Sequence, residues 1–270
     1  MSVKISDSDI DAYQNDGAVL IRGLLNDQEV SDLREGIESN ISNPSLNSKV
    51  ASNENDPGWF FEDFCTWQEN PSYKRIIFKS FVPEVAAKLM RSEEVRLYHD
   101  HMLVKKKGTL QRTPWHQDQP YYNIAGKQNI SFWIPVDPVP LEWTLEIVAG
   151  SHNGPWYMPR NFLEDQAKWF PEGSLSEIPD IDSNREKYRV LKWVLEPGDA
   201  VAFHMLTLHS GEGTGALRRV FSIRMLGDDI IHAPRSWKTS PDFSGLLDQL
   251  PAGKPMDHEL FPLAWPVSQS

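Results

Sequence analysis

Short strand-like runs, separated by glycine, proline and asparagine, fill the middle of the chain and limit the fold more than any other feature. The runs are rich in β-branched and other apolar residues, as strands are. Such a succession predicts a sandwich or barrel rather than a doubly wound parallel sheet, in which helices alternate with strands. The runs are residues 95–105, 129–136, 145–148, 188–195, 200–203 and 220–226.

The segments on either side of these runs differ in pattern, and the N-terminal one contains signals for helices. Ser6 and Asn26 are candidate N-caps of two helices. We expect helices at residues 6–15, 26–38, 72–78 and 82–90, a strand at 18–21, and an exposed, mobile loop at 39–56. No repeat or linker is evident, so we predict one domain. It comprises a helical part at about 1–92, a strand-rich core at about 93–230 and a proline-rich C-terminal wrap at about 231–270.

Charge and cysteine content exclude several classes of function. The net charge of −11 over 270 residues disfavours binding to nucleic acid and to anionic membranes. The single cysteine, Cys65, cannot form an internal disulfide or a cysteine-rich zinc site. No signal peptide or membrane-spanning run is evident, so the expected compartment is the cytoplasm.

One segment has the composition of a metal site. His116 and Asp118 are two residues apart, between Pro114 and Pro120. If the segment is extended, their side chains point to the same side and could bind one metal ion. A third ligand would come from His204 or His209, which are five residues apart and cannot both face the same way on a strand. Two histidines and one carboxylate form the site of non-haem Fe(II) oxygenases.

An arginine pair follows the second candidate histidine. Arg218 and Arg219 lie nine and ten residues beyond His209, and a guanidinium can hold a carboxylate by two hydrogen bonds. If Arg218 points inward, Ser222 and Arg224 share its face of the strand. If Arg219 does, Phe221 and Ile223 share it. Alternation alone leaves this choice open.

Together these residues resemble the phytanoyl-CoA dioxygenase family of Fe(II)/2-oxoglutarate oxygenases. The resemblance rests on His116-x-Asp118, His209, the arginine about ten residues further on, and Ala149-Gly150-Ser151-His152 between them. It extends to the N-terminal helix, strand and helix around Asp16-Gly17, and so covers about residues 8–227. It implies a mainly β fold with flanking helices: a double-stranded β-helix, or jelly-roll (cupin-like) barrel.

The resemblance also implies roles for individual residues. Fe(II) would be held by His116, Asp118 and His209, and the cosubstrate 2-oxoglutarate by Arg218 near Trp133. Reaction with O2 would release succinate and CO2 and hydroxylate an unactivated C–H bond. Further candidates follow from position: His101 for the cosubstrate pocket, and Tyr121, Tyr122, Asn123 and Trp143 for the substrate, below an insertion at 156–181.

Alternatives remain for several features. His99 and His101 could form a rival metal site, His152 and His204 are expected to be structural, and Lys105-Lys106-Lys107 suggests a solvated hairpin end. The partner is expected to be a small molecule, with a phosphonate or amine metabolite at least as plausible as an acyl-CoA, and the chain a monomer or homodimer. The competing functions are a non-catalytic jelly roll that binds a small ligand and a zinc hydrolase, which would have no use for a buried arginine.

Overall fold

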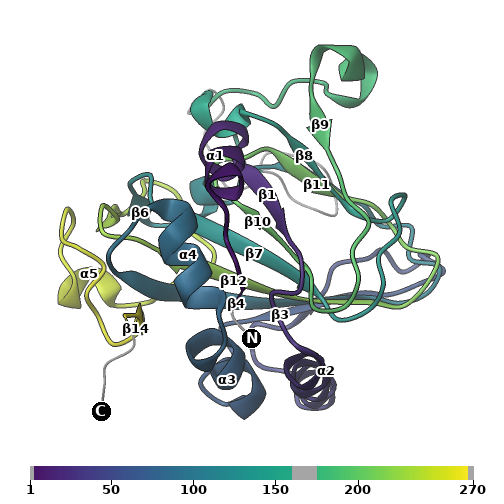
Figure 1. Cartoon of the computed structure of the whole chain (residues 1–270), viewed down its shortest axis with the longest axis horizontal. Helices are drawn as coiled ribbons and strands as arrows, with labels where there is room; N and C mark the ends of the chain where they lie inside the picture. The colour runs from purple at the N-terminus through teal and green to yellow at the C-terminus, as the bar shows by residue number, and fades with distance from the viewer. Residues whose placement is uncertain (1–2, 160–174, 267–270) are drawn as a thin grey trace.

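Two antiparallel sheets face each other in the computed structural model, which describes residues 3–159 and 175–266. The large sheet has the order β1-β10-β7-β12-β4-β3-β2, with β14 beside β4, and the small sheet has the order β5-β11-β8-β9. β13 and β6 form a separate pair. This is the expected jelly-roll arrangement (Figure 1). The strands are β1 (Ala18–Ile21), β2 (Lys49–Val50), β3 (Phe60–Phe64), β4 (Val95–Lys105), β5 (Thr113–His116), β6 (Ile124–Ala125), β7 (Asn129–Pro135), β8 (Leu145–Val148), β9 (Val190–Leu191), β10 (Ala200–Phe203), β11 (His209–Gly211), β12 (Arg218–Leu226), β13 (Ile231–His232) and β14 (Leu263–Trp265).

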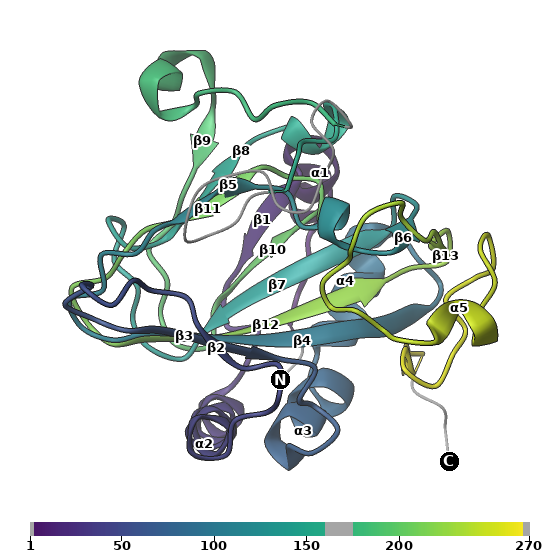
Figure 2. The same ribbon diagram turned by 180° about the vertical axis from the view of Figure 1, so that it is seen from behind.

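The four N-terminal helices cover the outer face of the large sheet, on the side away from the small sheet (Figure 2). Ser6 and Asn26 cap the first two helices with complete capping boxes, as their sequence positions predict. In the described residues, no helix is long and apolar enough to cross a membrane. The helices are α1 (Asp7–Asp16), α2 (Asp27–Ser42), α3 (Pro71–Lys79), α4 (Val82–Met90) and α5 (Leu246–Gln249).

Alternation along the long strands separates the core from the space between the sheets. On β12, Phe221 and Ile223 are fully buried in the cluster that joins the large sheet to the helices. Arg218, Ser222 and Arg224 face the opposite way and line a cavity between the sheets. The apolar face of the strand therefore packs against the helices, whereas the polar face is turned towards the cavity.

Three expectations about the connecting segments were wrong. The loop expected at 39–56 begins as the last turn of α2 and contains β2, which pairs with β3, because buried Asn40 hydrogen-bonds Asp63 of that strand at 2.8 Å. The strand expected at 188–195 is reduced to β9. The C-terminal segment does more than wrap the surface, since β14 pairs with β4 and Phe261 stacks on Tyr98.

Gly17, which ends α1, provides a test of packing at a helix terminus. Its φ is +77°, and a Cβ there would lie 2.4 Å from His152 Nδ1 and 2.5 Å from Thr207 Oγ1. Gly245 has nearly the same φ, +78°, but open space around it. We expect Gly245→Ala to cost about 1 kcal/mol through its backbone alone. Gly17→Ala should cost roughly 1–3 kcal/mol more through overpacking. Urea unfolding measures both, and equal losses would refute the close approach.

Candidate metal and cosubstrate site

Strand pairing brings the three predicted metal ligands together. His116 ends β5, His209 begins β11, and the two residues are direct partners across the small sheet. Asp118 lies where the chain turns out of β5, and the carbonyl of Met205 accepts its N–H at 2.8 Å. The Nε2 atoms of both histidines are 3.7 Å from Asp118 Oδ1. In the described residues, this is the one cluster of three such groups with ligand atoms within 4.8 Å of one another.

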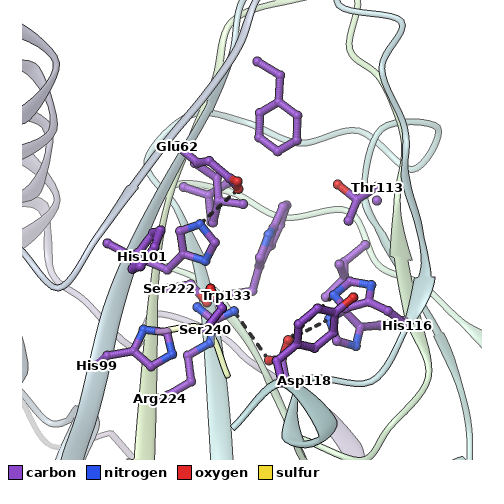
Figure 3. Close-up of a pocket in the computed structure, with 18 of the residues that line it drawn as sticks. Glu62, His99, His101, Thr113, His116, Asp118, Trp133, Ser222, Arg224 and Ser240 are labelled. Carbon is purple, nitrogen blue, oxygen red and sulfur yellow. Dashed lines mark hydrogen bonds and ion pairs between the residues drawn. The ribbon is translucent and has the colours of Figure 1, made fainter. Parts of the chain in front are cut away.

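Hydrogen bonds orient each ligand before any metal binds. His116 Nδ1 donates to the Pro114 carbonyl at 2.8 Å, and His209 Nδ1 donates to the Thr207 carbonyl at 2.9 Å. A carbonyl can only accept, so the lone pair of each neutral ring lies on Nε2. Asp118 Oδ2 accepts from Ser131 Oγ at 2.8 Å and lies 3.4 Å from Arg224 Nη2, which leaves Oδ1 directed towards the histidines (Figure 3).

Burial sets the protonation states that a metal requires. Desolvation, together with neighbouring His209, lowers the pKa of His116 to about 3, and desolvation also lowers the pKa of His209. Desolvation alone would raise the pKa of Asp118, but Arg224 and the two histidines outweigh it and hold that pKa well below its usual range. At neutral pH the site therefore offers two neutral imidazoles and one carboxylate. This donor set fits Fe(II), with the remaining coordination positions open.

Ser131 offers a test of how far the orientation of Asp118 matters. We expect Ser131→Ala to weaken metal binding by roughly 10- to 100-fold, because partners that orient a ligand have effects of this size. Ser222→Ala is the matched control. Ser222 lies on the adjacent strand and lines the same cavity, but its hydroxyl donates to the Phe132 carbonyl, at 2.7 Å. Titration with Co(II), followed by its visible spectrum, would compare the two variants, and equal affinities would contradict the proposed orientation.

A cationic end of the cavity lies at the start of β12. Arg218 is buried, its guanidinium is 5.8 Å from the Trp133 ring, and it donates to the backbone carbonyls of Trp143 and Glu212. Lys105 is its partner on β4 and donates to the carbonyls of Gln111, at 2.7 Å, and Glu212, at 2.9 Å. Both side chains line the cavity, so a guanidinium and an amine, neither of them hydrogen-bonded to a carboxylate, face the same place.

The neighbouring arginine has a different position. Arg219 faces the helix side, where it forms ion pairs with Asp137 at 2.6 Å and with Glu38 at 2.8 Å. Of the two arginines, Arg218 is therefore the one whose side chain points into the cavity. The expectation that Lys105 belongs to a solvated hairpin end was wrong. Its ammonium is buried 4.5 Å from the Phe60 ring, and burial lowers its pKa well below the usual value.

Most of the other predicted pocket residues also line the cavity. Trp133, His101, Tyr121 and Tyr122 do so. Asn123 does not. Its amide oxygen accepts from Tyr98 at 2.7 Å and its nitrogen lies 3.2 Å from His232, so the structure does not bring it to this site.

Trp143 also differs from expectation. Trp143 is absent from the cavity wall, and Gly215 packs closely against its ring. Residues 160–174 of the insertion expected over the mouth lie outside the described residues.

The remaining histidines are held by the backbone or by a carboxylate. His204 lies 2.9 Å from the Lys127 carbonyl and accepts the Leu206 N–H, and His152 lies 3.2 Å from the Gln14 carbonyl, which fits their expected structural role. His101 Nε2 is 3.1 Å from Glu62. His99 and His101 form no second three-residue metal cluster within the described residues.

Sequence reasoning missed several residues of the cavity wall. Glu62 and Lys49 come from β3 and β2, and pair with each other at 2.7 Å. Ser240 and Pro241 reach the cavity from the C-terminal segment. These four residues had no signal of the kind that strand alternation provided for Ser222 and Arg224, which share a face with Arg218.

Comparison with known proteins identifies the family. The sequence profile of phytanoyl-CoA dioxygenase (PhyH) matches residues 13–220. A search of curated proteins gave no match.

Solved structures share the fold at low sequence identity. The non-haem α-ketoglutarate-dependent carbocyclase SnoK from nogalamycin biosynthesis is 21% identical, with a TM-score of 0.74 over 96% of each chain. The epimerase SnoN, solved with Fe3+, α-ketoglutarate and nogalamycin RO, is 19% identical, with a TM-score of 0.74 over 96% of this chain and 98% of that chain. EctD from S. alaskensis, in its apoform, is 15% identical, with a TM-score of 0.64 over 83% of this chain and 77% of that chain. Since the profile spans most of the sequence and the His-Asp-His cluster is in place, the chain belongs to the phytanoyl-CoA dioxygenase family of iron- and 2-oxoglutarate-dependent oxygenases.

Proposed function

We propose that this protein hydroxylates an unactivated C–H bond of a small molecule, with consumption of 2-oxoglutarate and O2 and release of succinate and CO2. The observation that carries the proposal is a buried His-Asp-His cluster that borders a cavity with Arg218 and Lys105 at one end. A zinc hydrolase has no evident need for that cationic end. A protein that only binds ligands would not need three preset metal ligands.

The metal ligands and the Arg218 end of the cavity have proposed roles. His116, Asp118 and His209 would hold Fe(II), which when bound supplies the activation of O2. Arg218 and Lys105 would bind the carboxylate of 2-oxoglutarate that is remote from the metal, beside the Trp133 ring. Burial strengthens this contact, because electrostatic attraction is stronger in a protein interior than in water. In addition, both side chains donate to backbone carbonyls and not to carboxylates, so no protein anion competes with the cosubstrate in these hydrogen bonds.

The substrate would occupy the part of the cavity near Tyr121 and Tyr122. Both residues line the cavity, and the Tyr121 ring centroid is 6.2 Å from that of His116, with the two rings nearly perpendicular. Ser240 and Pro241 contribute to the wall from the C-terminal segment. These groups would exclude water and position the substrate, which are the contributions a protein makes when a cofactor supplies the reactivity.

Anaerobic spectroscopy tests the proposal directly. We expect Fe(II) and 2-oxoglutarate together to produce a weak visible charge-transfer band, because the three ligands leave room for a chelating keto acid. Fe(II) with succinate, which lacks the keto group, should give no such band. If the protein binds Fe(II) but no band develops with 2-oxoglutarate, the proposed site is excluded.

A screen for substrate-stimulated succinate release would then narrow the substrate. Acyl-CoA, amino-acid and phosphonate panels cover the main possibilities. The same assay on Fe(II)-free protein corrects for succinate that arises without the enzyme.

A further inference from the structure

Arg224 is a second buried arginine of the cavity, and the proposed reaction leaves it without a function. It is 6% exposed, lines the cavity, and directs Nη2 to Asp118 Oδ2 at 3.4 Å. Its Nε and Nη1 atoms are buried without a hydrogen-bond partner. Unsatisfied charged donors in a protein interior are costly, so they indicate a ligand that completes them.

His99 lies next to Arg224 and also has an unsatisfied atom. The two residues are direct partners on β4 and β12, and Figure 3 shows them on the same side of the pocket. His99 Nδ1 lies 3.0 Å from the Asp100 carbonyl, which can only accept, whereas its Nε2 is buried without a partner. In that tautomer Nε2 is an acceptor. This part of the cavity therefore presents a cationic donor and, beside it, a neutral acceptor.

The nearby acidic groups leave Nε and Nη1 of Arg224 without an acceptor. Asp118 is committed to the metal through Oδ1, and its other oxygen already accepts from Ser131. Glu62 is engaged by Lys49 at 2.7 Å and by His101 at 3.1 Å. The Tyr122 hydroxyl interacts with the guanidinium but carries no charge, since burial raises the pKa of Tyr122 above its usual value. The two unfilled donors of the guanidinium fit the carboxylate of a bound ligand.

The cosubstrate alone does not complete this pair. In the proposed function Arg218 holds the remote carboxylate of 2-oxoglutarate, and the other end of the molecule lies at the metal, beside Asp118 and within reach of Arg224. As a dianion, however, 2-oxoglutarate has no O–H or N–H group to donate to His99 Nε2. A second ligand that carries both a carboxylate and a donor would satisfy both residues.

We infer that the substrate is a carboxylic acid whose carboxylate binds Arg224 and whose neighbouring O–H or N–H group donates to His99. This inference rests on the proposed function, because it assumes that 2-oxoglutarate occupies the Arg218 end. Since Arg224 touches the metal-ligand carboxylate, the oxidised carbon would lie close to the carboxylate of the substrate.

Binding without turnover tests the inference. The full chain is saturated with Mn(II) and 2-oxoglutarate without O2, and the probes are lactate, 2-hydroxyhexanoate and mandelate, each with its amide. Dissociation constants are measured by isothermal titration calorimetry. We expect the wild type to prefer at least one acid over its amide by roughly tenfold or more, as loss of a charge-assisted contact predicts. Phenylacetate, which lacks the hydroxyl donor, should bind more weakly than mandelate.

Variants locate the bound acid. Arg224→Gln should abolish the preference for acids, and Arg224→Lys should retain part of it. Arg219→Gln, on the same strand but facing the helices, should leave it unchanged. Arg224→Gln should weaken the acid probes more than 2-oxoglutarate, and Arg218→Gln should show the reverse ranking.

Two results would overturn the inference. One is that the wild type binds acids and amides with equal affinity. This comparison uses only wild-type protein, so it does not depend on the folding of a variant. The other is a larger effect of Arg224→Gln on 2-oxoglutarate than on the acids, which would assign Arg224 to the cosubstrate. Failure of 2-oxoglutarate to bind the metal-loaded wild type would instead refute the proposed function, so the two failures are distinguishable.

Discussion

Replacing Asp118 with alanine is expected to abolish succinate formation while the chain stays folded. The substitution removes one of three metal ligands and the only anionic one, so the loss should exceed the roughly 10- to 100-fold effect of losing a partner outside the coordination sphere. Succinate is measured by chromatography after addition of Fe(II), 2-oxoglutarate and O2. Circular dichroism of the same samples reports folding.

Two controls separate chemistry from stability. Asp118→Ala also leaves Arg224 without its carboxylate neighbour, which can destabilise a buried charge. Asp118→Asn keeps the shape and an oxygen for Ser131, and should be equally inactive with a smaller loss of stability. Asp182→Ala removes a half-exposed carboxylate that pairs with Arg112 outside the cavity, and should remain active. Succinate formation by folded Asp118→Ala at the wild-type rate would exclude Asp118 as a ligand.

The second large effect is expected at the cationic end of the cavity. Arg218→Ala should raise the 2-oxoglutarate concentration needed for half-maximal succinate formation by roughly 10- to 100-fold, the range of hydrogen bonds to charged groups. Arg219→Ala should leave that requirement near the wild-type value. Arg219 faces Asp137 and Glu38 instead of the cavity, so its loss removes no group that borders the cosubstrate. The opposite ranking would show that the assigned roles of these arginines are reversed.

Local pattern was sufficient to predict the parts of the site that lie on one segment. The His116 and Asp118 spacing, the helix caps and the alternation of β12 all depend on residues near one another in sequence. The extended conformation assumed for Asp118 was only partly right, because the chain turns at that residue. A tertiary hydrogen bond to the Met205 carbonyl, which no local pattern reveals, stabilises this turn.

Residues brought in by pairing between distant strands could not be predicted. Glu62 reaches the cavity because β3 adds to the edge of β4, and the aromatic run around it contains no signal for that pairing. Lys105 looked solvated beside two further lysines, yet its register opposite Arg218 buries it. Asn123 was wrongly placed because position after the motif was the only argument for it. The hydroxyl of Tyr98, on β4, holds it elsewhere.

The division of β12 into two faces has a consequence for how this protein can diverge. The side chains that pack against the helices and those that line the cavity alternate along one strand. A substitution at Val220, Ser222 or Arg224 changes what the cavity recognises without removing a contact from the helix-side core. Positions that determine which ligand binds therefore alternate along β12 with positions that maintain the core. New specificities could arise along this strand by single substitutions, while Phe221 and Ile223 preserve the scaffold.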